Sequence, residues 1–229
     1  MEKSHIKVCC INCQCMSTAF KKLLPKQLRS IDNKRSELKY RKGEMICKDG
    51  SFVSSLIFIK KGLVKVYLDK GREQVIIGLK KSGDFIGLSS IYEDRLLYSA
   101  EALEDTDACI TDLRTFNTIL NENAAFSTEI IKLINKDLAK IYDRMYSFSN
   151  IQIRGRFAEL LLALMENIYE SNPFELKLSR KVMAELVSTS NESISRLTKE
   201  FKSKNIIKVK GRVFEISDIE ELRRLSFEE

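Results

Sequence analysis

Apolar positions between residues 37 and 113 occur in short runs that turn residues interrupt. Residues 56–59, 63–68 and 74–79 are rich in β-branched and aromatic side chains, which is typical of β-strands. Glycine-containing turns such as Lys61-Gly62 and Ser82-Gly83-Asp84 punctuate this region. Many short strands at close spacing predict an antiparallel barrel or jelly roll, and they argue against a βαβ arrangement.

The pattern changes near residue 115, and from there to about residue 148 the apolar period becomes helical. Apolar positions are then separated alternately by three and four residues, which is the seam spacing of a coiled coil. We therefore expect a long helix over about residues 115–148 that pairs with a second copy of the chain. Alternatively, the helix packs on its own barrel, for which Ile130 and Leu133 offer a second apolar face. The residues of the expected dimer seam are Ile131, Ile134, Leu138, Ile141 and Met145.

Two short helices are expected in the last third of the chain, after a longer one over residues 152–169 that ends before Pro173. Ser179 is a natural N-cap for the first of them, and the polar turn 188–190 follows. The second runs from Asn191 to about Lys204 and is polar and basic on its outer face. This order is typical of a helix-turn-helix.

A predicted β-hairpin over residues 206–216 supplies a wing, and a last helix over about residues 217–225 closes the domain. We place the domain boundary at Ser149-Asn150. The fold class is α+β, with a cysteine-rich segment (1–20), a jelly-roll sensor domain with the dimerisation helix (21–149) and a winged helix-turn-helix (150–229).

The chain of 229 residues carries a net charge of +7, which indicates that it binds an anionic partner. Residues 177–212 hold ten basic and three acidic side chains, so the excess is concentrated in the helix-turn-helix. No apolar run approaches the roughly 18 residues of a membrane span. The first residues lack the apolar stretch of a signal peptide, and we expect a cytoplasmic protein. An enzyme finds little support, because the chain has one histidine and no phosphate loop.

Four of the six cysteines fall within residues 9–15, while Cys47 and Cys109 stand apart. In a reducing cytosol, clustered thiols suggest a metal or redox site and not a disulfide scaffold. Cys47 lies in a strand pattern and is expected to be a small buried apolar residue. His5 is expected to be an exposed terminal residue.

Three motifs near the C-terminus carry a family resemblance. They are Leu178-Ser179-Arg180, Glu192-Ser193-Ile194-Ser195-Arg196 and Val209-Lys210-Gly211-Arg212. This stretch is similar to the C-terminal domain of CRP/FNR transcription regulators, which carry L-[ST]-R, E-[ST]-[IV]-[SG]-R and V-x-G-[RK]. The resemblance implies a dimeric regulator that binds double-stranded DNA, and it allows RNA polymerase as a further partner.

The side chains of this domain predict how DNA is read. Arg196 can pair with guanine O6 and N7, Glu192 can accept from cytosine N4, and Ser195 can reach a thymine. The Glu-x-x-Ser-Arg arrangement resembles the FNR branch and implies palindromic TTGA-type half-sites, although Asn191 stands where CRP has arginine. The expected base-reading residues are Asn191, Glu192, Ser195 and Arg196. The expected phosphate contacts are Arg180, Lys199, Lys208, Lys210 and Arg212.

The N-terminal half resembles the cyclic-nucleotide-type jelly roll of the same family. Lys42-Gly43-Glu44, Gly62 and residues 82–87 carry this likeness. Cyclic-nucleotide binders hold the ribose with glutamate and the phosphate with arginine, where this chain has Leu88 and Tyr98. Neither side chain can make those contacts, so we expect no binding of cAMP or cGMP. A cyclic-nucleotide-binding signalling protein remains the alternative function.

The cysteines resemble the ligand set of FNR oxygen sensors, which hold a [4Fe–4S] cluster. Cys109 matches the position of the last ligand, and Cys10, Cys13 and Cys15 are candidates for the others, with Cys9 as a substitute. The N-terminal spacing is tighter than in FNR. Structural zinc and free redox-active thiols therefore stay open beside the cluster. The expected function is a DNA-binding regulator that responds to a redox, gas or small-molecule signal.

Overall fold

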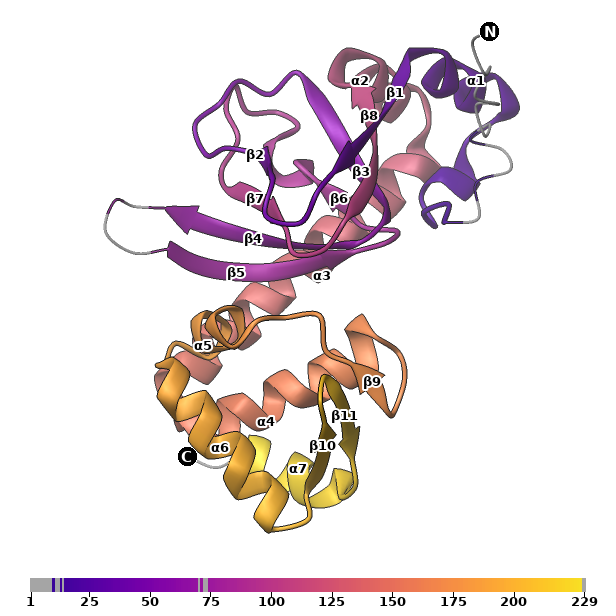
Figure 1. Cartoon of the computed structure of the whole chain (residues 1–229). Coiled ribbons are helices and arrows are strands. Elements are labelled where there is room, and N and C mark those ends of the chain that lie inside the picture. Colours follow the sequence, from indigo (N-terminus) through magenta and orange to yellow (C-terminus); the bar gives the residue numbers. More distant parts are fainter. Residues whose placement is uncertain (1–9, 11–12, 14, 70, 72–73, 228–229) are drawn as a thin grey trace, which may run out of the picture. The chain divides into compact units, whose positions relative to one another are not determined.

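The computed structural model describes residues 10, 13, 15–69, 71 and 74–227, which form two compact units (Figure 1). The first unit contains Met1–Asp69 and Leu79–Leu138, and the second contains Lys70–Gly78 and Ala139–Glu229. The domain boundary that we expected at residue 149 stays a prediction.

The β-structure of the N-terminal half consists of two four-stranded antiparallel sheets, which confirms the jelly roll. One has the order β1 (Arg35–Tyr40), β8 (Thr106–Asp112), β3 (Ser55–Lys61), β6 (Phe85–Ile86). The other has the order β2 (Met45–Cys47), β7 (Ser99–Ala102), β4 (Leu63–Asp69), β5 (Gln74–Lys81). The three predicted strand runs coincide with β3, β4 and β5.

Gly62 fixes the tight connection between β3 and β4. Its φ of +112° is a conformation that side chains with a Cβ rarely adopt. A Cβ here would also lie 2.3 Å from Oγ1 of Thr106, at the start of β8. Only glycine fits this close approach of two chain segments.

The core of the first unit joins the barrel to an N-terminal helical segment that the sequence analysis missed. This segment comprises the short helix η2 (Phe20–Lys22) and α1 (Pro25–Lys34). Phe20 packs against Phe85 and Phe126 with ring centroids 5.5 and 6.0 Å apart. The segment after the cysteines is therefore part of the folded unit.

The expected single helix over residues 115–148 is wrong in its first part. The structure has two helices, α2 (Leu113–Glu122) and α3 (Ala124–Asn150), with a break at Asn123. The Asn123 amide explains the break, because its oxygen accepts from the Phe126 N–H at 3.0 Å and its nitrogen donates to the Lys22 carbonyl at 3.0 Å. A short polar side chain that binds backbone in this way starts a new helix.

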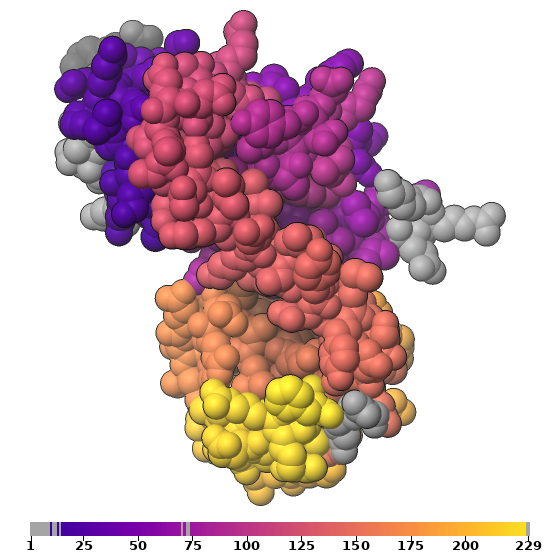
Figure 2. Space-filling view, turned by 180° about the vertical axis from the view of Figure 1, so that it is seen from behind, coloured from indigo at the N-terminus to yellow at the C-terminus, as the bar shows by residue number. Residues whose placement is uncertain are grey.

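The predicted dimer seam is largely exposed in the single chain. Ile131 and Met145 are 57% and 62% exposed, and Leu138 and Ile141 are also exposed. Ile134 is half-buried and packs against the core, which Ile130 joins directly. Figure 2 shows the salmon surface of α3 uncovered along much of its length. One helix thus has both an inward face and an apolar outward face.

The second unit contains the predicted winged helix-turn-helix. Its helices are α4 (Ile153–Ala163), which a π-helical turn (Leu164–Ile168) extends, then α5 (Arg180–Val187), α6 (Asn191–Ser203) and α7 (Ile219–Ser226). A three-stranded antiparallel sheet has the order β10 (Ile207–Lys210), β11 (Val213–Ile216), β9 (Phe174–Glu175). Phe157 of α4 packs on Phe201 of α6 with ring centroids 5.4 Å apart.

Candidate nucleic-acid interface

Helix α6 has one buried face and one polar face. Ser190 caps its N-terminus, because the Ser190 hydroxyl accepts from the Ser193 N–H at 3.2 Å. Ile194 and Phe201 are fully buried, and Leu197 lies between them at 5% exposure. Their spacing of three and four residues puts them on the same side, so the polar residues of α6 face outward.

Helix α5 and the turn that follows fix where α6 begins. Ser179 caps α5 as predicted, accepting from the Val182 N–H at 3.2 Å. Ser188 ends the helix in a left-handed conformation, with φ of +52°. The Thr189 N–H then donates to the Ala184 carbonyl at 2.9 Å, which closes the turn.

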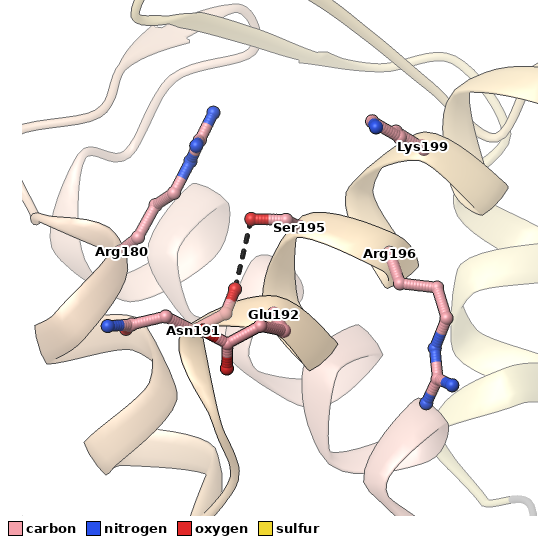
Figure 3. Close-up of a pocket in the computed structure, with 6 residues that line it drawn as sticks. All are labelled: Arg180, Asn191, Glu192, Ser195, Arg196 and Lys199. Carbon is pink, nitrogen blue, oxygen red and sulfur yellow. Dashed lines mark hydrogen bonds between the residues drawn. The ribbon is translucent and has the colours of Figure 1, made fainter.

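Six of the predicted DNA-contacting residues line one shallow depression (Figure 3). Arg180 and Lys199 extend on the same side as the Ser195 hydroxyl, while Arg196 extends away from them (Figure 3). All four expected base-reading residues and two of the five expected phosphate contacts are therefore brought together. The lining residues are Arg180, Asn191, Glu192, Ser195, Arg196 and Lys199.

Hydrogen bonding sets what this surface can offer to a base. The Ser195 hydroxyl donates to the Asn191 carbonyl at 2.9 Å, so its lone pairs face outward as acceptors. The backbone N–H of Glu192 and the Ser190 hydroxyl lower the pKa of the Glu192 carboxyl, which is therefore ionised at neutral pH. The surface thus combines acceptors at Ser195 and Glu192 with the donors of Arg180, Arg196 and Lys199.

The wing carries the other three predicted phosphate contacts, and all are exposed. Lys208 lies in β10 and its ammonium is 3.0 Å from the Glu215 carboxylate of β11. Lys210 and Arg212 flank Gly211 at the hairpin turn. The Arg212 carbonyl accepts from the Leu176 N–H at 2.8 Å, which ties the turn to the segment before α5.

Two arginines that support the helix-turn-helix were not found by sequence reasoning. The Arg154 guanidinium of α4 lies 3.1 Å from the Glu200 carboxylate of α6. Arg144 of α3 donates to the Leu186 carbonyl of α5 at 2.7 Å. Both residues are single charged positions among other charged side chains of their helices, and no local signal identifies a partner that lies 42 or 46 residues away.

Three N-terminal cysteines, Cys10, Cys13 and Cys15, adjoin the barrel. Cys10, Cys13, Cys109 and Arg35 line one small cavity, and the Sγ atoms of Cys13 and Cys15 are 3.3 Å apart. The Arg35 guanidinium is 3.5 Å from the Cys109 Sγ. Within the described part of the chain, no three His, Cys, Asp or Glu side chains are grouped closely enough to hold one metal ion. The substitute ligand Cys9, and His5, lie outside the described residues.

Burial makes three of these thiols, those of Cys10, Cys15 and Cys109, weaker acids than a free cysteine. It raises the pKa of Cys10 to about 12 and, together with a hydrogen bond to Cys13, that of Cys15 to about 11. Burial also raises the pKa of Cys109, against the opposing effect of Arg35. Protonated thiols are poor nucleophiles at neutral pH, so this environment disfavours simple thiol chemistry. A metal would have to displace the protons.

The two positions on which the expected lack of cyclic-nucleotide binding rests, Leu88 and Tyr98, hold buried side chains. Leu88 is 4% exposed and Tyr98 is 9% exposed. The Tyr98 hydroxyl accepts from the Gly87 N–H at 2.8 Å, and burial raises the pKa of Tyr98 to about 12. That cAMP and cGMP do not bind stays a prediction. Cys47 is half-buried, and burial raises its pKa to about 11.

No helix in the described residues is both long and apolar enough to span a bilayer.

Comparison with protein families matches residues 37–123 to the cyclic nucleotide-binding domain and residues 155–225 to the Crp-like helix-turn-helix domain. The chain is 25% identical over 228 residues to the fumarate and nitrate reduction regulatory protein of Yersinia pestis, covering 97% of this chain and 90% of the relative. It is 27% identical over 192 residues to electron transport regulator A of Shewanella oneidensis, covering 81% and 76%. FixK2 from Bradyrhizobium japonicum has the same fold, with a TM-score of 0.77 at 21% identity, covering 83% of this chain and 96% of that one.

Proposed function

The chain belongs to the CRP/FNR family of DNA-binding transcription regulators, which are not enzymes, and from this premise we propose that it reads a specific DNA sequence with the outer face of α6. The observation that carries the proposal is the single depression that all four predicted base-reading side chains line. A recognition helix inserted in the major groove presents such a face to base edges.

Each side chain of this face has a distinct task in the proposed readout. Arg196 pairs with a guanine through O6 and N7, and the ionised Glu192 accepts from a cytosine amino group. Ser195 and Asn191 contact neighbouring bases. A second set of side chains binds phosphates and sets the register, as their exposed positive charges support; two of them line the same depression and three lie in the wing. These are Arg180, Lys199, Lys208, Lys210 and Arg212.

We propose that two copies of the chain pair through α3 and bind a palindromic site with TTGA-type half-sites. The exposed apolar seam of α3 supports a second copy as the occupant, because its three-four spacing matches that of a two-stranded coiled coil. RNA polymerase as a further partner and the cytoplasmic location both stay predictions.

Arg196→Ala tests the proposed readout. We expect the variant to lose its preference for the selected operator while its salt-sensitive binding to unrelated DNA persists, because a bidentate arginine–guanine pair supplies about 1–3 kcal/mol of discrimination. Selection from random duplexes with the wild-type chain identifies the operator, and titrations against operator and scrambled DNA measure the preference.

Lys202→Ala is the matched control, because Lys202 is an exposed basic residue of α6 outside the depression. It should leave the preference unchanged. An Arg196→Ala variant that still prefers the operator as strongly as the wild type contradicts the assignment.

For the signal, we propose a [4Fe–4S] cluster held by Cys10, Cys13, Cys15 and Cys109. The shared cavity of Cys10, Cys13 and Cys109, with Cys15 next to Cys13, supports this set. The raised pKa of Cys10, Cys15 and Cys109 also supports it, because it disfavours free thiol sensing. When bound, such a cluster supplies sensitivity to oxygen or redox state. Asp32 of this chain holds Cys10 in place, because its carboxylate accepts from the Cys10 N–H at 3.3 Å and from the Arg35 guanidinium at 2.7 Å.

A further inference from the structure

Arg144 links the last part of α3 directly to the helix-turn-helix. It lies six residues before the end of α3, in the part that belongs to the second unit. Its Nη2 donates to the Leu186 carbonyl at 2.7 Å, across 42 residues of sequence. This contact joins the helix that carries the dimer seam to the helix that precedes the recognition helix.

The accepting carbonyl lies where α5 needs an outside partner. Leu186 is the last residue but one of α5, so its carbonyl is among those that the helix itself leaves without a donor. The neighbouring Ala184 carbonyl accepts from the turn, at the N–H of Thr189. A guanidinium at this position also complements the negative end of the helix dipole. Arg144 therefore completes the end of α5 at Leu186, two residues before the left-handed Ser188.

The surroundings of the guanidinium hold it in one place. It stacks over the Phe148 ring at 4.5 Å from the centroid, and the Arg156 guanidinium is 5.4 Å from the same ring. Burial lowers the pKa of Arg144 to about 10, which leaves it positively charged at neutral pH. The Ser147 hydroxyl binds the Glu159 carboxylate, which supplies the compensating charge nearby. The Arg144 guanidinium is thus a partly buried positive charge with fixed partners, and not a solvated surface charge.

We infer that Arg144 is a positioning residue for DNA recognition: its hydrogen bond to Leu186 fixes the turn that sets the direction of α6 against the end of α3. The inference rests on the proposed base readout by α6. It assigns no DNA contact to Arg144. The side chain acts by holding the Ser188–Ser190 turn, so that paired copies of α3 present their recognition helices at a fixed spacing.

Arg144→Met tests the inference, because methionine keeps much of the stem but has neither charge nor donor. We expect faster amide hydrogen exchange in a peptide that covers residues 183–190, and operator affinity lower by roughly tenfold or more, as the loss of a charged hydrogen bond implies. Affinity for scrambled DNA should change little. Arg144→Lys restores the charge and one donor, and should recover most of the operator affinity and of the exchange protection.

Lys140→Met is the control, because it removes an exposed charge one turn earlier on α3. It should match the wild type in both measurements.

An Arg144→Met variant whose turn exchanges amide hydrogens as slowly as in the wild type overturns the inference. Faster exchange that leaves operator affinity unchanged overturns it as well. If Arg144→Met does not fold, the test rests on Arg144→Lys. A folded lysine variant whose affinity for the operator is far below that of the wild type rejects the role. A wild-type chain without sequence preference would contradict the base readout, while the exchange data still test whether Arg144 holds the turn.

Discussion

Asp112 lies where β8 ends and α2 begins, and its carboxylate holds that junction. Oδ1 accepts from the Thr115 backbone N–H at 2.9 Å and from the Thr115 hydroxyl at 3.1 Å. These hydrogen bonds, the backbone one foremost, lower the pKa of Asp112. The junction matters because the long α3 follows directly after α2.

We predict that Asp112→Ala lowers the free energy of unfolding by about 1 kcal/mol, the usual effect of losing an N-cap. Because the folded-state pKa is depressed, the ionic part of this stabilisation is present above the unfolded pKa of about 3.9 and is lost as the pH falls through the folded value. Urea unfolding at neutral and acidic pH measures both effects. Asp112→Asn keeps an acceptor and should lose less at neutral pH. An alanine variant as stable as the wild type rejects the cap.

Local caps were predictable from sequence, whereas distant pairings were not. Ser179 was identified because a capping hydroxyl acts within three residues of its own position. The buried Arg35 was missed, because its partners include Cys109, which is 74 residues away. Sequence reasoning likewise assigned Ser195 to thymine without seeing that its hydroxyl donates to its own helix.

At the scale of elements, α3 is the helix with two apolar faces. The inward face belongs to the core through Ile130, while Leu138 and Ile141 of the outward face are exposed. The seam spacing predicted the outward face. The break before α3 was harder to predict, because neither glycine nor proline marks it and Asn123 acts through its amide.

We predict that Ile141→Glu prevents dimerisation without unfolding the chain. Ile141 is exposed in the single chain, so a charge there is tolerated alone but is repelled across a paired seam. Sedimentation equilibrium should give a mass near 26.4 kDa for the variant and about twice that value for the wild type. Lys136→Glu, at the outermost position of the same repeat, should stay dimeric. A dimeric Ile141→Glu protein would mean that another surface pairs the copies.

At the scale of the whole molecule, a barrel unit with the cyclic nucleotide-binding fold and a DNA-binding unit share one chain. Composition and turn spacing were sufficient to predict both folds, since strand runs and helix periodicity are local properties. The placement of Cys10 and Cys13 beside Cys109 was not visible in spacing, because it depends on how α1 packs against the barrel.

We predict that the chain purified without oxygen contains iron and sulfide in near-equal amounts and has a visible absorbance that air bleaches. Iron analysis and spectra before and after exposure to air measure this. Cys109→Ser should retain much less iron, whereas Cys47→Ser should retain all of it, because Cys47 is not among the residues that line the cavity of Cys10, Cys13 and Cys109 and its thiol donates to the Tyr98 carbonyl. A colourless wild-type protein without iron contradicts the cluster.

The hydrogen bond from Ser195 to the Asn191 carbonyl affects how strictly this regulator would select the bases of its binding site. It uses the only hydroxyl proton, so Ser195 and the ionised Glu192 both accept and cannot donate. Adenine and cytosine each present an amino group in the major groove. An acceptor therefore distinguishes these two bases from guanine and thymine, but it does not distinguish them from each other. Such positions carry half the information of a guanine, the base that we propose for Arg196. A mutation at the guanine therefore creates or removes a binding site in a promoter. An exchange of adenine for cytosine at a neighbouring position changes the affinity for that promoter little.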